Sequence, residues 1–334
     1  MGLGRRIGRR KFLYSVLGST LAPACFSALA QPRAKTWHIG FLGDGTPTSR
    51  AAEFREFRAG MAELGYREGR NLVIEARWTD GIGARRSALA QELVRMNVDV
   101  MVTHGEQAAL AAKAATTTIP IVVAVSADFL VNGLVKSLSH PGGNLTGRTD
   151  QVRALAAKEV QLLKEVLPNA QLAGVLWESD NINASKAVED MQAAARDLHL
   201  RLLAEPVRTP EEIASAFDRM ASGGVTAALV LHTPLTMNHR GDIARIAVQK
   251  RIALVGAPVQ FAEAGALFSY GPDLPQYFRQ AATLVDKILK GAKPQDMPIE
   301  QATKFEFVIN MRTARALGVS IPPSIFVRAD RVID

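Results

Sequence analysis

The stretch Val98–Val125, VDVMVTHGEQAALAAKAATTTIPIVVAV, decides the fold class of this chain. Its two ends, 98–103 and 119–125, are short runs rich in β-branched residues, and they predict strands. Residues 106–115 between them have the spacing of a helix. The run 98–102 is almost continuously apolar, which suits a strand that is buried on both faces. A strand, a helix and a second strand in this order predict a parallel sheet with right-handed crossovers.

The same alternation of strands and helices continues on both sides of this stretch. Before it, the spacing predicts strands at 37–42 and 72–78 and helices at 49–64 and 84–96. A segment dense in turn residues, 140–147, then separates a first series of elements from a second. The second series is predicted to contain helices at 154–167, 184–198, 210–221 and 240–250 and strands at 172–177, 200–205, 227–231 and 253–255. We therefore predict an α/β fold of two doubly wound, Rossmann-like domains, each with a parallel sheet.

The last part of the chain is predicted to contain too few strands and helices for a third domain. It holds strands at 266–270 and 305–310 and helices at 274–289 and 311–317. We expect these elements to complete the two sheets, so that the chain crosses between the domains more than once and forms a hinge. The predicted lobes are 36–150 plus about 259–300, and 151–258 plus about 301–334. Because ligands of open α/β sheets bind at the carboxyl ends of strands, the predicted site is the cleft between the lobes.

Residues 1–30 have the layout of an export signal. Basic residues run to Lys11, an apolar stretch follows over 12–26, and Ala28-Leu29-Ala30 offers a cleavage site after Ala30. The piece 9–13, RRKFL, resembles the twin-arginine export motif, but Gly8 replaces the usual Ser or Thr, so the Sec route stays open. Lipidation at Cys25 is a weaker alternative. Each of these routes predicts a periplasmic protein.

The charge of the chain is concentrated in this signal. The whole chain carries a net charge of +8, but five basic residues and no acidic residue lie in 1–30. Removal of the signal leaves a weakly basic body, whose Lys and Arg are mixed with Asp and Glu. This distribution argues against nucleic acid as a partner.

Several kinds of chemistry have no motif here. The first predicted strand ends in a segment with Gly40, Gly43 and Gly45, whose spacing G-x-x-G-x-G fails the dinucleotide fingerprint. The six histidines include no helical i,i+4 pair, and the one cysteine lies in the signal. We therefore predict no cofactor, no metal and no catalytic residue. A secreted enzyme that transfers protons through His104, Glu106 or Asp128 remains an alternative.

Polar residues cluster just after the predicted strands, and these loops supply the candidate ligand-binding residues. They are Asp44, Gly45, Thr103, Glu106, Asp128, Ser179, Asn181 and Asn183. Hydroxyls, amides and a few carboxylates suit a small zwitterion, with N–H and O–H groups on its carboxylate and an acidic side chain on its ammonium. The same residue types also favour helix N-caps, so a structural role is the alternative. Tyr270 is predicted either to cap the cleft or to pack at the hinge.

Four stretches give the chain a family resemblance. They are HPGGNLTG at 140–147, GALFSYGPD at 265–273, a segment over 281–294, and KFEFVINMRTARALGVSIPP at 304–323. They resemble the substrate-binding proteins of an ABC-transporter family with the periplasmic-binding-protein type I fold, whose members take up tryptophan or other aromatic amino acids. The resemblance implies a monomeric solute receptor that docks an inner-membrane permease. Residues 127–129 and 177–183 depart from the family pattern, so the solute is not carried over. A solute sensor for a signalling partner is a further alternative.

Overall fold

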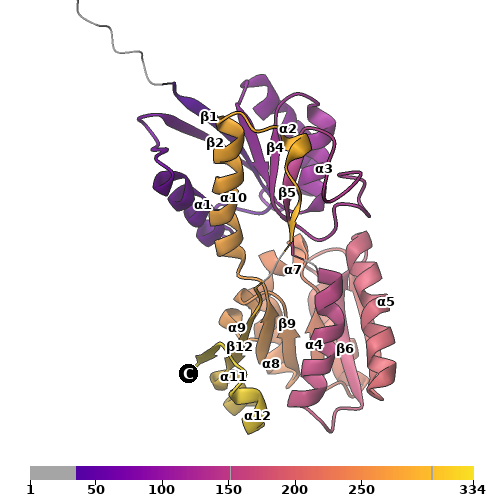
Figure 1. Ribbon diagram of the computed structural model, residues 1–334. Coiled ribbons are helices and arrows are strands. Elements are labelled where there is room, and N and C mark those ends of the chain that lie inside the picture. The colour runs from indigo at the N-terminus through magenta and orange to yellow at the C-terminus, as the bar shows by residue number, and fades with distance from the viewer. Residues whose placement is uncertain (1–34, 151, 302–303) are drawn as a thin grey trace, which may run out of the picture. The chain divides into compact units, whose positions relative to one another are not determined.

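The structure is a computed structural model that describes residues 35–150, 152–301 and 304–334. The predicted export signal at 1–30 lies outside the described residues. The described chain forms two β-sheets, each with helices packed on it (Figure 1). The prediction of two α/β domains built on parallel sheets is confirmed.

Sheet A has six strands in the order β11-β5-β4-β3-β1-β2, and its pairs are parallel. Its strands are β1 (Trp37–Gly43), β2 (Leu72–Trp78), β3 (Val100–Thr103), β4 (Ile121–Ser126), β5 (Leu145–Thr149) and β11 (Glu300–Gln301). Its helices are α1 (Ala51–Glu63), α2 (Arg86–Arg95), α3 (Glu106–Ala115) and α10 (Leu274–Leu289). Helix α1 packs beside α10, and α2 packs beside α3.

Alternate residues of the sheet A strands point to opposite faces, and both faces are covered. Val100 and Val102 of β3 lie in the same apolar cluster as Phe57 of α1 and Phe278 of α10. Met101, between them, lies in a second cluster with residues of α2 and α3. A side-chain period of two with helices on both faces explains why the successive residues Val100, Met101 and Val102 are all apolar.

Sheet B has seven strands in the order β13-β12-β10-β9-β8-β6-β7. They are β6 (Leu172–Glu178), β7 (Arg201–Val207), β8 (Ala227–Val230), β9 (Ala253–Gly256), β10 (Phe268–Gly271), β12 (Glu306–Asn310) and β13 (Arg331–Ile333). The longer helices around it are α4 (Val152–Val166), α5 (Ile182–Asp197), α6 (Glu212–Ser222) and α8 (Arg240–Gln249). The shorter ones are α7 (Pro234–Asn238), α9 (Gln260–Ala264), α11 (Met311–Leu317) and α12 (Pro323–Phe326).

The chain passes between the sheets three times within the described residues. It leaves sheet A after β5, returns from β10 through α10, and leaves again after β11. Strand β11 is parallel to β5, so it also runs toward sheet B, and β12 then enters sheet B antiparallel to β10. The predicted lobe bounds placed 259–300 in the first lobe, whereas the pairing of β10 places 268–271 in sheet B.

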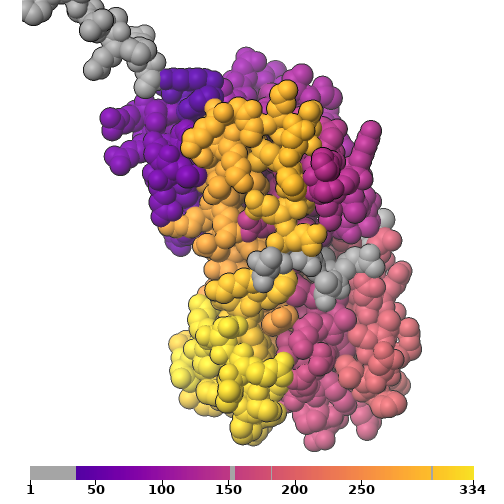
Figure 2. Space-filling model, in the orientation of Figure 1, coloured from indigo at the N-terminus to yellow at the C-terminus, as the bar shows by residue number. Residues whose placement is uncertain are grey.

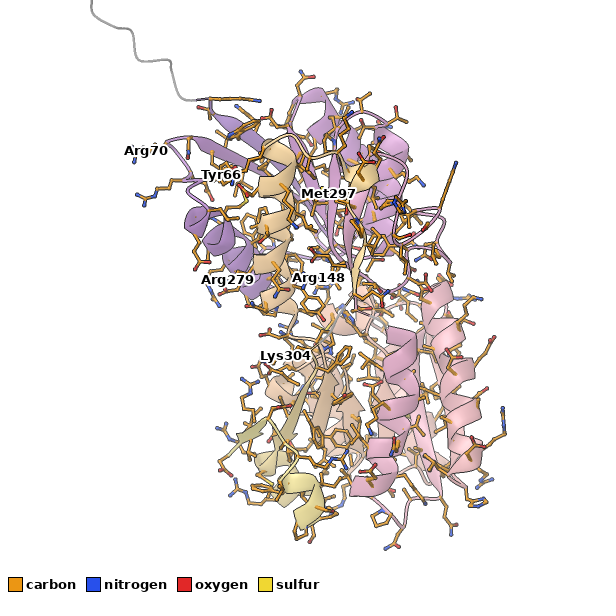
Figure 3. All side chains as sticks on the ribbon, viewed as in Figure 1. Tyr66, Arg70, Arg148, Arg279, Met297 and Lys304 are labelled. Atoms are coloured by element: carbon orange, nitrogen blue, oxygen red, sulfur yellow. The ribbon has the colours of Figure 1, made fainter. Side chains whose placement is uncertain are left out.

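Late segments of the chain are tied firmly to sheet A. In the space-filling view, α10, in orange, lies beside indigo α1 (Figure 2). Arg148 of β5 donates hydrogen bonds to Gln280 of α10 and to Glu300 of β11. The guanidinium carbon of Arg148, the residue labelled beside α10 in Figure 3, lies 5.1 Å from the ring centre of Tyr277, also on α10. One side chain therefore holds three segments that are far apart in the sequence.

A carboxylic acid is buried in the sheet B part of the structure. Glu159 of α4 is 2% exposed, and the backbone N–H of Ala257 donates to its carboxyl group. Its Oε1 has no hydrogen-bond partner among the residues that the structure describes. Burial raises the pKa of Glu159 well above the usual value, and the hydrogen bond from Ala257 opposes this only in part. The folded protein therefore favours the protonated, neutral form of this side chain.

We expect Glu159→Gln to stabilise the protein more at pH 8 than at pH 5. In the unfolded chain, the Glu159 carboxyl group loses its proton near the ordinary pKa of about 4.3. At neutral pH, folding must therefore keep this group protonated although it is ionised in the unfolded chain, and this costs free energy. The contribution of Glu159 to the stability of the wild-type protein falls as the pH rises from about 4.3 toward the raised folded pKa, and the glutamine variant lacks this contribution. Thermal melts at both pH values measure the difference.

The control for this experiment is Glu189→Gln, which removes an exposed carboxylate from α5. Its effect on the melting temperature should be small and alike at the two pH values. If Glu159→Gln shows no larger gain at pH 8 than at pH 5, Glu159 is not held neutral in the fold.

Candidate functional site

A small cavity lies where strands of both sheets end. Its lining follows β1, β3, β4 and β5 of sheet A and β6 and β8 of sheet B, and α10 adds Leu274 and Phe278. The lining residues include Arg50, His104, Glu106, Ser126, Asp150, Asn181, His232 and Thr233. The volume of the cavity is about 50 Å³. This is far below the roughly 300–1,000 Å³ of typical ligand pockets.

Two hydrogen-bond donors from sheet A line the cavity. Arg50, which precedes α1, is 3% exposed; its Nε donates to the backbone oxygen of Asp44 at 3.3 Å, and its Nη1 donates to Glu53 at 3.5 Å. Burial lowers the pKa of Arg50, and the nearby acids Glu53 and Asp44 oppose this. The guanidinium is thus a largely desolvated cation, a strong partner for an anionic group.

The second donor is His104, whose ring state is fixed by the backbone. Its Nε2 accepts a hydrogen bond from the N–H of Asp44 at 3.0 Å, so the proton of the neutral ring is on Nδ1. Burial and the charge of Arg50 hold the pKa of His104 well below the usual value. A neutral ring with Nδ1–H can donate to a ligand, but it is not a base with a free lone pair.

Glu106, at the start of α3, supplies a hydrogen-bond acceptor instead of a donor. Its Oε2 accepts hydrogen bonds from Asn132 at 3.1 Å and from Asn183. Its Oε1 is buried without a partner in the described parts of the chain, as is Oγ of Ser126. Burial raises the pKa of Glu106, and the amides of Asn183 and Asn132 oppose the shift. An unsatisfied buried acceptor beside a cavity suits a donor group on a ligand.

Three contacts join residues that follow sheet A strands to residues that follow sheet B strands. Glu106 accepts from Asn183, Ser49 Oγ donates to Asn238 Oδ1 at 3.4 Å, and Asp150 Oδ2 lies 3.4 Å from His232 Nδ1. The first and the third of these contacts involve residues that line the cavity, so opening it by separating the two sheets would break them.

Some of the residues predicted from the sequence meet at the cavity. Glu106 and Asn181 line it, and Asn183 donates to Glu106. Asn181 also caps α5, since its Oδ1 accepts from the N–H of Ala184 at 3.0 Å. Whether these side chains contact a ligand stays a prediction.

The other predicted residues have partners within the fold. Asp44 accepts from Thr79 at 2.9 Å and pairs with Arg86 at 2.8 Å, while Thr103 Oγ1 donates to the backbone oxygen of Leu42. Gly45 has φ +109°, a conformation that favours glycine, and its N–H donates to Thr79. Asp128 caps the N–H groups of Leu130 and Val131, and Ser179 accepts from Arg208. Tyr270 packs against Phe305, with ring centres 6.0 Å apart.

The sequence analysis did not select Arg50, Asp150 or Phe278, which line the cavity. Arg50 comes directly before α1, in the loop after the predicted strand at 37–42, so the loop argument could have found it, whereas Asp150 follows β5, a strand that was not predicted. Phe278 is an interior position of an amphipathic helix, and its pattern predicts only that it is buried.

The described residues 35–150, 152–301 and 304–334 include no group of three His, Cys, Asp or Glu side chains that could hold a metal ion. None of their helices is both long enough and apolar enough to cross a membrane.

Two α/β domains linked by several crossings, with a polar cavity at their strand ends, define the periplasmic-binding-protein type I class. Within this class, the chain belongs to the ABC transporter substrate binding protein family, whose sequence model matches residues 47–333. The family resemblance seen in the sequence is thereby confirmed. Members of this family bind the substrates of ABC transporters.

Individual relatives support the same assignment. A structure from Streptococcus pneumoniae, described as an ABC domain in complex with L-Trp, is 28% identical with a TM-score of 0.83, and the match covers 90% of this chain and all of that one. A conserved domain protein from Vibrio cholerae is also 28% identical with a TM-score of 0.83, over 89% of this chain and all of that one. A tyrosine-binding protein of Clostridioides difficile is 25% identical, over 79% of this chain and 75% of its own length.

Proposed function

We propose that this protein is the periplasmic solute receptor of an ABC importer and that its solute is an amino acid. The observation that carries the proposal is that hydrogen-bond donors and a carboxylate acceptor line one cavity. Arg50 and His104 offer buried donors for a carboxylate, and Glu106 offers a buried acceptor without a partner for an ammonium. The L-Trp complex and the tyrosine-binding relative favour the same class of solute.

Entry of an amino acid requires the two lobes to separate. A cavity of about 50 Å³ holds a few water molecules and not an amino acid. The three crossings of the chain provide the hinge for such a motion, and the lobes would close again around the solute. The closed form would then dock a membrane permease. The monomeric state and cleavage of the export signal after Ala30 are part of the proposal, as are the predicted lobe bounds with residues 268–271 moved to the second lobe.

A thermal-shift screen of the chain from Gln31 onward tests the proposal. We expect one or more L-amino acids to raise the melting temperature, while sugars and polyamines do not. A ligand at 100 times its Kd adds about 2.7 kcal/mol to the free energy of unfolding, which is readily measured. Isothermal titration with the best amino acid gives its affinity and stoichiometry.

The screen tests the receptor function and the amino-acid assignment independently. If a sugar or a polyamine stabilises the protein and no amino acid does, the receptor function stands and the amino-acid assignment is wrong. If the bound molecule is chemically altered after incubation, the protein is an enzyme and the receptor function is overturned.

A further inference from the structure

The two oxygens of the Glu106 carboxylate have different surroundings. Oε2 accepts from Asn183, at the start of α5 on sheet B, and from Asn132, in the loop after β4 of sheet A. Oε1 has no partner among the described residues, although Glu106 is only 4% exposed. One carboxylate therefore joins residues of the two sheets through Oε2 and has a buried oxygen, Oε1, without a donor, in a residue that lines the cavity.

The position of Glu106 in the chain explains why it can do both. It is the first residue of α3 and follows Gly105, whose φ of +73° lets the backbone turn from β3 into the helix. Asn183 lies in the first turn of α5 on the other side, as the second residue of that helix after the N-cap residue Asn181. Both residues lie at helix starts after parallel strands, so they face each other only when the two sheets bring these strand ends together.

We propose that Glu106 couples recognition of an ammonium group to closure of the lobes: Oε1 binds the ammonium of the solute while Oε2 holds Asn183. This inference rests on the proposed amino-acid receptor function, and it assigns the solute a primary amine as its required feature. It also assigns Asn183 a positioning role, since Asn183 acts on the solute only through Glu106.

The physical basis is cooperation between the two hydrogen bonds. An ammonium against Oε1 supplies the donor that this buried oxygen lacks. Its positive charge also favours the ionised carboxylate, which accepts more strongly from the Asn183 amide at Oε2. A solute without the amine would leave Oε1 unpaired in the closed form, and closure around that solute would be correspondingly less favourable.

The first test measures closure without any solute. The chain has one cysteine, Cys25, which is absent when the protein is produced from Gln31 onward. Cysteines introduced at the exposed positions Ala114 on α3 and Ala193 on α5 can therefore be labelled for single-molecule energy transfer. We expect Asn183→Ala to shift the distribution toward low transfer, the open form. Asn183→Asp, which places a second carboxylate against Glu106, should do the same.

The matched control for closure is Asn169→Ala, an exposed asparagine in the loop before β6, at the opposite end of sheet B. Its transfer distribution should equal that of the wild-type protein. If Asn183→Ala and Asn183→Asp also leave the distribution unchanged, the contact does not hold the lobes, and the coupling is overturned.

The second test measures recognition of the amine with the amino acid from the screen and its des-amino analogue. The wild-type protein should prefer the amino acid, and Glu106→Gln should weaken its binding about 10- to 100-fold, as expected for loss of a charged hydrogen bond. The analogue should bind the two proteins alike, because glutamine can still accept from Asn183. An unchanged preference in Glu106→Gln overturns the inference while the receptor function stands. A screen without any amine ligand overturns both.

Discussion

Replacement of Arg50 with lysine is expected to weaken amino-acid binding about 10- to 100-fold while the protein stays folded. Lysine retains the positive charge beside buried Glu53, so no carboxylate is left uncompensated. It loses the planar fork of the guanidinium, which donates at once to Asp44, to Glu53 and, in our proposal, to the solute carboxylate. A charged hydrogen bond contributes about 1.5–3 kcal/mol, which corresponds to the stated loss in affinity.

The measurement is isothermal titration of Arg50→Lys and of a control, Arg55→Lys, with the amino acid found by the screen. Arg55 lies on α1 with its side chain 71% exposed, so its variant should bind as the wild type does. Equal affinities for both variants would remove Arg50 from the carboxylate subsite. A thermal melt of each variant without solute shows whether a loss of binding reflects a loss of folding.

Phe278→Ala is expected to lower the free energy of unfolding by about 3–5 kcal/mol, the typical cost of truncating a buried phenylalanine. Phe278 is fully buried on α10, with its ring centre 5.4 Å from that of His104 and 6.3 Å from that of Phe41. It packs α10 onto sheet A and also lines the cavity. Its removal therefore leaves a void that the surrounding side chains cannot fill.

Chemical denaturation of Phe278→Ala measures this loss, and Phe326→Ala is the matched control. Phe326 is 46% exposed on α12, so its truncation should cost much less. If the two variants lose the same stability, α10 is not packed on sheet A as the structure has it. Phe278→Leu, which keeps most of the volume, should recover a large part of the lost stability.

Most of the fold could be predicted because its strands are short apolar runs between amphipathic helices. Strand β5 was missed, since its residues 145–149 follow a segment rich in Gly, Pro and Asn that indicates turns. Gly147 has a packing reason to be there: a Cβ at this position would come within 2.3 Å of the backbone oxygen of Val123 on β4. A glycine that permits close strand packing looks, in the sequence alone, the same as a glycine in a turn.

The candidate site was only partly predictable for a related reason. Polar residues that directly follow predicted strands were predicted to bind the ligand. Three of them, Glu106, Asn181 and Asn183, lie together in the structure. The same argument also selected Asp44 and Thr103, whose side chains are used within sheet A. Asp150 follows the strand that was missed, so it was missed with it. Polarity after a strand does not reveal which partner a side chain has.

The order in which the chain is synthesised has a consequence for how sheet A is completed. Phe57 and Met61 of α1 are covered by α10, and β5 pairs on its outer side with β11. The packing of α1 and the pairing of β5 are therefore complete only after residues up to Gln301 have been synthesised. Until then a ribosome-bound chain would expose the apolar face of α1 and an unpaired edge of β5. Contacts across more than 200 residues are slow to form, as for Tyr66 with Asp286. The first lobe is thus finished only at Gln301, although its first strand is made first, and a chain truncated before α10 should aggregate instead of folding.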